Sequence, residues 1–499
     1  MTKRNPLYLL LTIVVLLSSI LPFTSCNKKD NDDDTVYSYS TSTQTTLVTS
    51  FGLQADADVL ASLDSVYFTV DYDRGLIYNA DSLPVGTDIS GLKVKVNFQN
   101  TVSSAIFSIT GATSQADTTI EYTASMSKKL DFTGKTLLTV TSADKSQVKE
   151  YEVKVLVHKA NPDLLVWPME WRRDLPGYSS GATGHKTVQQ GEVYRTMVYN
   201  GTECKMLSSS SLFGGSWSSQ TVDMPFTPQV STLTAIDEAL FILAEDGTLY
   251  ASTDGTDWAS CGVIWHNLLG AYENRVLGIL SGDDGYYHDE YPHTDDFIVT
   301  PIEDGFPVSH SSDMIQTDYT WSLSSQAMLV GGYDSDGKLL SDVWGYDGER
   351  WAKINNSHSH SLPALADATL FSYCTYKKLP GVRRYGLQQT WYVMGGRLSD
   401  GSLNGKIYLS NTQGIVWAQA DTTIVQPDYV PKFYGAQAFV NYETMSASVA
   451  SNMPRRVSSP ITTWECPFIY LMGGYNEEDE LLPYVWRGVF NRMTNYPVY

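Results

Sequence analysis

Short apolar runs in the C-terminal two-thirds of the chain each end at a pair of glycines. The runs are Ala327–Val330, Trp391–Met394 and Ile469–Met472. The glycine pairs are Gly331 and Gly332, Gly395 and Gly396, and Gly473 and Gly474. Twelve residues after the second glycine of each pair stands an aromatic residue: Trp344, Tyr408 and Trp486. A repeated unit of strand, glycine pair, loop and aromatic residue is typical of a kelch-type β-propeller.

Weaker copies of the same unit precede the three clear ones. We identify six in all: residues 193–217, 240–258, 276–299, 327–351, 391–417 and 469–490. The sequence therefore predicts a propeller over residues 163–499 with six blades. A propeller with seven blades remains an alternative, because the glycine pairs are unevenly spaced. The tryptophans expected to fill the wedges between blades are Trp217, Trp258, Trp351 and Trp417.

A different pattern occupies residues 46–158. Segments such as Leu92–Phe98 and Tyr151–Val157 alternate apolar with polar residues, as strands with one wet face do. Short strands separated by turn residues predict an immunoglobulin-like β-sandwich. The fold class expected for the whole chain is thus all-β, an Ig-like sandwich followed by a propeller.

The first residues predict export. Lys3 and Arg4 precede the apolar run Leu7–Leu17, and small residues lead to Cys26. This arrangement resembles a bacterial lipoprotein signal over residues 1–25, which implies lipidation of Cys26; an ordinary secretory signal is the alternative. Residues 26–45 are polar and acidic near their start, which predicts a solvated tether. The tether resembles the export tag of surface lipoproteins, so we expect an outer-membrane anchor facing the exterior.

Residues 77–92 carry a resemblance that spans nearly all of the chain after the signal. They are similar to the N-terminal module of an uncharacterised family of Gram-negative lipoproteins. That family has an Ig-like module followed by a C-terminal kelch-type propeller, similar to that of galactose oxidase. The resemblance implies a domain layout and no known activity.

The charge of the chain excludes one class of partner. The sequence has 34 Lys and Arg against 55 Asp and Glu, a formal net charge of −21. Such a surface repels phosphate, so nucleic-acid binding is excluded. Four scattered cysteines remain after Cys26, without the C-x-x-C spacing that zinc sites use.

Several motifs resemble enzyme signatures without completing them. Ser252-x-Asp254-Gly255-x-x-Trp258 resembles the Asp-box of sialidase-like propellers, a turn that lies away from the active site in those families. A sialidase also needs three arginines around a carboxylate and a Tyr–Glu nucleophile pair, and no such set can be identified. No cofactor is predicted. Acidic loops at 334–337 and 477–480 could hold calcium, but acidic hairpin turns have the same composition.

Aromatic residues in polar segments are the candidate binding residues: Tyr286, Tyr287, Tyr319 and Trp321. We therefore expect a non-enzymatic binding or scaffolding module whose propeller loops contact a glycan or a protein. The alternative is a glycosidase-like, carbohydrate-active enzyme with carboxylates at the propeller axis.

Overall fold

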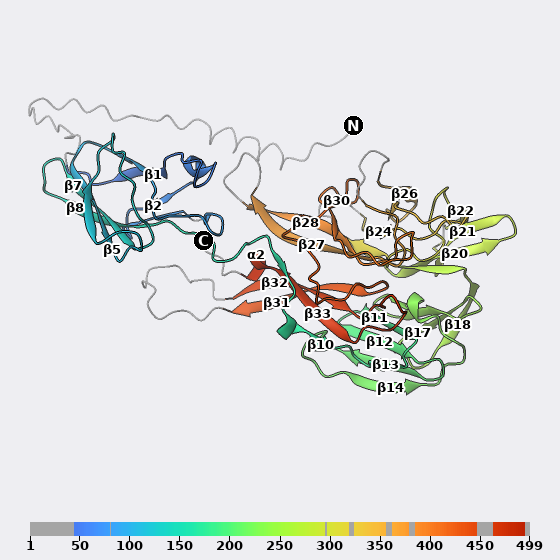
Figure 1. Ribbon diagram of the computed structural model, residues 1–499. Helices are drawn as coiled ribbons and strands as arrows, with labels where there is room; N and C mark the ends of the chain where they lie inside the picture. Colours follow the sequence, from blue (N-terminus) through green and yellow to red (C-terminus); the bar gives the residue numbers. More distant parts are fainter. Residues whose placement is uncertain are drawn as a thin grey trace, which may run out of the picture. The chain divides into compact units, whose positions relative to one another are not determined.

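The computed structural model describes residues 44–79, 81–294, 297–318, 324–355, 362–378, 385–446 and 463–494. The described chain divides into two compact units. The N-terminal unit includes residues up to Asp81 and Asp88–Val155, and the C-terminal unit includes Ser82–Thr87 and everything from Leu156. Both are built almost entirely of strands (Figure 1), as the alternating patterns predicted. Among the described residues, no helix is long and apolar enough to span a membrane.

The N-terminal unit contains two sheets. Strand β1 (Val48–Leu53) pairs with β4 (Val94–Phe98). The larger sheet has the order β2-β3-β8-β7-β5-β6, with β3 and β8 parallel. Its strands are β2 (Thr69–Asp71), β3 (Leu76–Tyr78), β5 (Val102–Thr110), β6 (Thr118–Glu121), β7 (Lys135–Ser142) and β8 (Val148–Lys154), and a 3-10 helix covers Leu63–Ser65. The buried side of each strand alternates with exposed residues, which produces the one-sided pattern seen in the sequence.

The described part of the C-terminal unit forms six antiparallel sheets, and in the first five the strands lie in chain order. The first holds β11 (Gly184–Gln190), β12 (Val193–Tyr199), β13 (Cys204–Ser209) and β14 (Ser218–Val222). The second holds β15 (Thr234–Ala235), β16 (Leu240–Leu243), β17 (Thr248–Ser252) and β18 (Ala259–Ile264). The third holds β19 (Asn267–Tyr272), β20 (Arg275–Gly282), β21 (Gly285–Tyr291) and β22 (Thr300–Pro301).

The last three sheets follow the same plan. The fourth holds β23 (Ile315–Thr317), β24 (Gln326–Val330), β25 (Val343–Tyr346) and β26 (Trp351–Lys353). The fifth holds β27 (Thr369–Lys378), β28 (Tyr385–Met394), β29 (Tyr408–Ser410) and β30 (Ala418–Gln419). The sixth holds β31 (Gln437–Ser446), β32 (Thr463–Met472) and β33 (Tyr484–Phe490), before the short helix α2 (Asn491–Thr494). Further 3-10 helices cover Met169–Trp171 and Val230–Thr232.

The sixth sheet takes its fourth strand from the beginning of the unit. Strand β10 (Arg173–Asp174) pairs antiparallel with β33, with Arg173 opposite Val485. Strand β9 (Leu165–Val166) pairs with the far end of β33. The two ends of the unit therefore meet in one sheet, which closes the row of sheets into a ring.

Among the described residues, five clusters of buried apolar side chains pack between neighbouring sheets. Each cluster contains buried side chains from consecutive sheets, and one of them also joins the sixth sheet to the first. Representative pairs across the joints are Met206 with Leu240, Phe241 with Val276, Leu277 with Leu329, Met328 with Leu370, and Phe468 with Tyr194. Because no small sheet can bury both faces alone, stacking around the ring covers them.

The glycine pairs stand where the second strand of a sheet ends. Gly331 and Gly332 have φ of 68° and 94°, in the left-handed region that only glycine adopts at little cost. A Cβ on Gly331 would lie 2.1 Å from the carbonyl oxygen of Leu365, which belongs to the segment leading to the next sheet. The amide of Gly332 donates to that same oxygen at 2.8 Å. Glycine is thus required both by the turn and by the close approach of the next segment.

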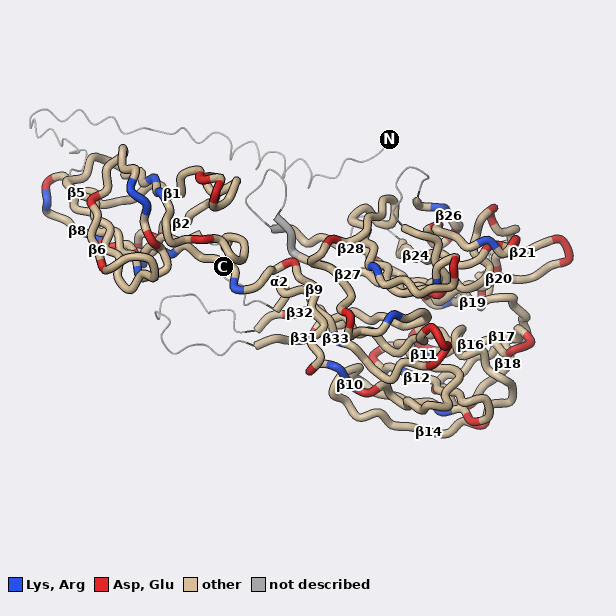
Figure 2. The backbone as a smooth tube through the Cα atoms, in the orientation of Figure 1, with Lys and Arg blue, Asp and Glu red and all other residues tan. Residues whose placement is uncertain are grey.

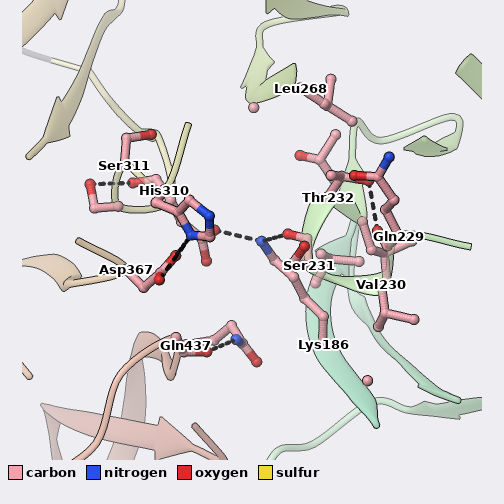
Figure 3. A pocket seen from close by; sticks show the side chains of 18 of the residues that line it. Lys186, Gln229, Val230, Ser231, Thr232, Leu268, His310, Ser311, Asp367 and Gln437 are labelled. Atoms are coloured by element: carbon pink, nitrogen blue, oxygen red, sulfur yellow. Dashed lines mark hydrogen bonds and ion pairs between the residues drawn. The ribbon is translucent and has the colours of Figure 1, made fainter. Parts of the chain in front are cut away.

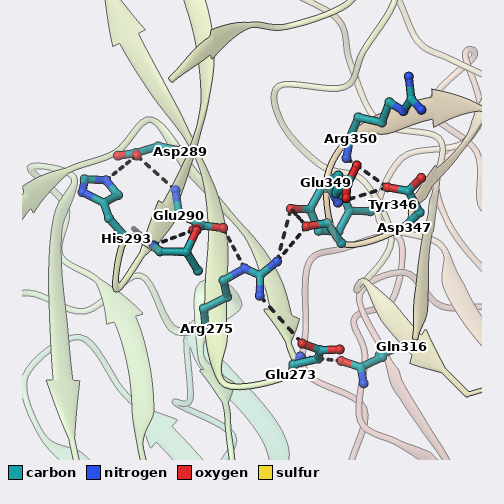
Figure 4. Close-up of polar contacts among 12 residues, drawn as sticks. Glu273, Arg275, Asp289, Glu290, His293, Gln316, Tyr346, Asp347, Glu349 and Arg350 are labelled. Atoms are coloured by element: carbon teal, nitrogen blue, oxygen red, sulfur yellow. Dashed lines mark hydrogen bonds and ion pairs between the residues drawn. The ribbon is translucent and has the colours of Figure 1, made fainter. Parts of the chain in front are cut away.

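A polar network joins the third and fourth sheets (Figure 4). Arg275 lies with Nε 2.6 Å from Oε2 of Glu290, an ion pair whose N–H does not align as a hydrogen bond. Its Nη2 donates to the carbonyl of Gly348 in the fourth sheet at 2.9 Å. Glu290 accepts from the backbone and hydroxyl of Thr294 at 2.9 and 2.7 Å. These contacts surround a charged pair that is almost fully buried.

Candidate functional site

A polar cavity of about 890 Å³ lies inside the ring of sheets. The first strand of each of the six sheets, or the segment leading into it, contributes to its wall. In each sheet the loop between the second and third strands lies at the same end as the start of the first strand. Three such loops reach the cavity, through Glu245, Arg397 and Asp479. We call this space the axial cavity (Figure 3).

Lys186 crosses the axial cavity. It stands on β11 of the first sheet, and its Nζ lies 2.5 Å from Oδ1 of Asp313, which precedes the fourth sheet. The same Nζ donates to the carbonyl of Ser231 at 2.7 Å. In a ring of six sheets the first and fourth lie opposite, so this ion pair spans the axis. Figure 3 shows Lys186 reaching between the His310 side of the cavity and the Ser231 side.

His310 and Asp367 form a second pair at the wall. The Nδ1 of His310 lies 3.0 Å from both carboxylate oxygens of Asp367. Both residues have positive φ, 54° and 51°, and the amide of Asp367 donates to the carbonyl of His310 at 2.8 Å. The amide of Gly435 in turn donates to the carbonyl of Asp367. Hydrogen bonding to Asp367 raises the pKa of His310 above its usual 6.5.

A third group surrounds Arg397, which follows the glycine pair of the fifth sheet. Its Nη2 donates to Oδ1 of Asp479 at 2.8 Å, and Tyr434 donates to the same oxygen at 2.7 Å. The guanidinium carbon also lies 3.6 Å from the centre of the Tyr434 ring. Burial raises the pKa of Tyr434, and its hydrogen bond to Asp479 adds to the shift. The ring of Tyr475 is 5.4 Å from that of Tyr434.

Buried polar residues fix the inner strands behind these groups. His185 on β11 is 4% exposed, and its Nε2 is 3.1 Å from the carbonyl of Pro176. Burial lowers the pKa of His185 to about 4, so the ring is neutral. Its backbone amide donates to the hydroxyl of Tyr475, and Gln437 Oε1 accepts from the amide of Thr187. The first and sixth sheets are thereby joined at the cavity wall.

The predicted tryptophans lie between sheets. Trp351 and Trp417 are buried, 7% and 3% exposed, in clusters that include side chains of the preceding sheet. Trp217 and Trp258 are partly buried against similar clusters. The indole N–H groups of Trp258 and Trp417 each donate to the glycine carbonyl of their turn, at 3.1 and 2.8 Å. Trp344, Tyr408 and Trp486, the aromatic residues twelve positions after the glycine pairs, are also buried.

Two of the predicted binding residues, Tyr286 and Tyr287, are not part of the lining of the axial cavity. Tyr286 and Tyr287 were expected in a loop, but they lie on strand β21, which pairs along its length with β20. Tyr286 packs beside an apolar cluster and His266, and Tyr287 donates to Asp284 at 2.5 Å. The other two predicted binding residues, Tyr319 and Trp321, lie outside the described residues, as does Cys26.

The acidic loop at 334–337 contains a carboxylate that caps its own turn. Asp334 accepts from the amides of Asp336 and Lys338 at 3.1 and 2.9 Å. Throughout the described ranges, no group of three or more His, Cys, Asp or Glu is placed to hold a metal ion. The cysteines that the structure describes, Cys204, Cys261, Cys374 and Cys466, are free thiols.

Two family models match the chain. The DUF6242 beta propeller domain matches residues 161–497, and the domain of unknown function (DUF6242) N-terminal domain matches residues 37–155. The chain belongs to the DUF6242 family. The predicted all-β fold with a C-terminal propeller is thereby confirmed, and so is the resemblance to an uncharacterised family with a C-terminal propeller. No curated protein matches this DUF6242 chain.

Solved structures resemble the chain only distantly. YjhT is 9% identical, covers 62% of this chain and 95% of its own, and has a TM-score of 0.37. YCF48 bound to D1 peptide is 15% identical, with coverages of 71% and 89% and a TM-score of 0.29. The α-L-arabinofuranosidase Arb93A from Fusarium graminearum, in complex with an iminosugar inhibitor, is 10% identical. Its coverages are 67% and 98%, and its TM-score is 0.33. At these TM-scores the structures carry no argument about function.

The charged residues of the axial cavity were missed by the sequence reading. Lys186 and Asp313 are 127 residues apart, and His310 and Asp367 are 57 apart. Only a repeat alignment could have found some of them, because Arg397 directly follows a glycine pair just as Tyr333 and Tyr475 do. That position leads from the second strand toward the centre of the ring.

Proposed function

We propose that the chain is a binding or scaffolding module that holds a glycan or a protein segment in the axial cavity. The observation that carries this proposal is the polar lining of a space of about 890 Å³, to which all six sheets contribute. Such a volume lies in the range of sites that enclose a small ligand. Its hydroxyl, amide and charged groups point to a ligand rich in hydrogen-bonding groups.

The proposal includes a finer architecture and a location. The six sheets are the blades of a six-bladed, kelch-type propeller, supported by the glycine pairs and the closure through β10. The N-terminal unit is an Ig-like spacer, supported by its two sheets with alternating burial. Cys26 carries the lipid, and the chain faces outward from the outer membrane. Replacing Cys26 by Ser should release the protein from the membrane fraction; retention there would contradict the anchor.

Three of the four carboxylates that line the cavity are paired, which favours binding over glycoside cleavage. A glycosidase needs one carboxyl group that delivers a proton and a second that acts as a base or nucleophile. Here Asp313 and Asp479 each face a cationic side chain at 2.8 Å or less, and Asp367 faces the imidazole ring of His310 at 3.0 Å. Each of these pairs occupies a carboxylate oxygen, so the carboxyl group is not free to act on a glycosidic bond. The experiment that tests ligand binding also includes an assay for glycoside cleavage.

Blocking the cavity tests the proposal. Ser231 lines the cavity and is exposed, so Ser231→Trp should fill the space without disturbing a core. Ser219→Trp is the matched control, because Ser219 is exposed on the outermost strand of the first sheet. Glycan arrays and pull-downs with both variants should show binding lost only in Ser231→Trp. Ligand binding that survives in Ser231→Trp, or turnover of chromogenic glycosides, would refute the proposal.

A further inference from the structure

The cations that face the axial cavity are already compensated. The three pairs are Lys186 with Asp313 at 2.5 Å, Arg397 with Asp479 at 2.8 Å, and His310 with Asp367 at 3.0 Å. A ligand carboxylate or sulfate needs a cation with free N–H donors for a strong charge-assisted contact. At Lys186 it would have to displace Asp313 first, and at Arg397, which keeps further N–H donors, the neighbouring Asp479 carboxylate would repel it.

Lys186 shows the constraint most clearly. Its side chain is only 12% exposed, and its ammonium group is held by Asp313 and the carbonyl of Ser231. An ammonium group has three donors, so at most one remains for a ligand. Displacing Asp313 would leave a carboxylate beside the incoming anion. The centre of the cavity therefore disfavours a second negative charge.

The loops around the mouth of the cavity repel anions as well. The loops between the second and third strands of the six sheets lie at this end of the ring, and they contain only three basic residues, Lys338, Arg397 and Lys406. Their acidic residues are Glu203, Glu245, Asp246, Asp283, Asp284, Asp334, Asp336, Asp342, Asp400, Glu477, Glu478, Asp479 and Glu480. Red segments mark several of these loops in Figure 2, including the tip of the β20–β21 hairpin. A rim of one sign raises the local concentration of opposite charges and excludes like charges.

Neutral hydroxyl groups fit the same lining well. A hydroxyl donates one hydrogen bond and accepts others, so it can bridge a paired cation and carboxylate without separating them. Arg397 and Asp479 offer such a pair at the mouth, where their side chains are 38% and 67% exposed. The Arg397 guanidinium covers one face of the Tyr434 ring, so the remaining surface of Tyr434 and the neighbouring ring of Tyr475 supply apolar contact for the C–H face of a sugar. Serine, threonine, asparagine and glutamine side chains continue the polar wall inward.

We propose that the axial cavity binds an uncharged, hydroxyl-rich glycan, and that Arg397, Asp479 and Tyr434 form the subsite for one sugar ring. This inference rests on the proposed binding function and narrows its ligand class. It excludes uronic-acid, sulfated and sialylated glycans as ligands of this cavity.

A glycan array that contains neutral and anionic glycans tests the ligand class with the purified full chain. Binding should be confined to uncharged glycans. Titration calorimetry on a bound oligosaccharide should then give an affinity that changes less than about twofold between low and high salt, because no net charge is neutralised. Arg397→Met and Asp479→Asn should each weaken binding about tenfold, the effect of losing one hydrogen bond to a charged group. Arg492→Met is the matched control, because Arg492 pairs with Asp163 at 2.9 Å away from the cavity.

Distinct results separate this inference from the proposed function. Binding of anionic glycans that Ser231→Trp abolishes would overturn the inference and leave the cavity as a binding site. Binding of hexalysine with a steep loss in salt would do the same, because a cation would then be the preferred occupant. Neutral-glycan binding that Arg397→Met and Asp479→Asn leave unchanged would overturn the subsite. An array without any bound glycan would overturn the ligand class.

Discussion

Removing one partner of the Arg275–Glu290 pair should strongly destabilise the propeller unit. The side chains are 10% and 1% exposed, and their charges are 2.6 Å apart at the nearest atoms. Arg275→Met would leave the Glu290 carboxylate buried without its cation. Losing one member of a buried pair costs about 3–5 kcal/mol, because the remaining charge is neither solvated nor paired. That is a large part of the roughly 5–15 kcal/mol by which a typical domain is stable.

Urea unfolding followed by tryptophan fluorescence measures this loss of stability in the C-terminal unit. All 12 tryptophans lie between Trp167 and Trp486, so the N-terminal unit contributes no signal. The assay should include Glu290→Gln and the double variant, since the double variant removes both charges. We expect the sum of the two single variants' losses in free energy of unfolding to exceed the loss in the double variant. The difference is the coupling energy between the two side chains and should be at least about 1 kcal/mol.

A surface pair in the same unit supplies the control. Lys353 lies 2.8 Å from Asp342, but the lysine side chain is 45% exposed. Lys353→Met should cost no more than about 1 kcal/mol, since water solvates the charges in either case. If Arg275→Met cost as little as this control, or if the single losses simply added, the buried pair would not hold the third and fourth sheets together as we argue.

Three further predictions concern the core, the glycine turns and the cavity. Trp351→Ala should cost about 3–5 kcal/mol in the same urea assay, because it empties a wedge between two sheets, and a loss below about 1 kcal/mol would contradict that packing. Gly331→Ala should lower the thermal stability more than Gly337→Ala, although both glycines have positive φ. A Cβ at Gly331 would lie 2.1 Å from a carbonyl oxygen, whereas one at Gly337 meets nothing within 4 Å. Equal thermal stabilities of the two variants would refute the clash. His310 should titrate above 6.5 by NMR and shift down in Asp367→Asn. Because the pKa of His310 is raised in the folded state, its pair with Asp367 stabilises the fold below about pH 6.5, and this contribution is lost as the pH rises through the folded pKa. An unchanged titration of His310 in Asp367→Asn would show that Asp367 does not set this pKa.

Local repeats in the sequence were enough to locate the second strand of each sheet in the C-terminal unit. Each apolar run before a glycine pair is the second strand of a sheet, as in Gln326–Val330 before Gly331. The reason is that strand alternation, turn glycines and wedge aromatics all act within a few dozen residues, the length of one sheet. The segment around Tyr286 was predicted as a binding loop because its aromatic and acidic residues resemble a polar loop. Pairing with β20 makes it a strand instead.

The candidate site depended on the closed ring. Lys186 meets Asp313 only because six sheets place the first opposite the fourth, and no local pattern marks either residue. The same holds for Arg397 and Asp479, which come from the loops of neighbouring sheets. The sequence by itself determined a repeated β architecture and an acidic composition. It also predicts an export signal. Only tertiary structure decided which charges face one another across the axis, because that depends on how many sheets close the ring and in what order.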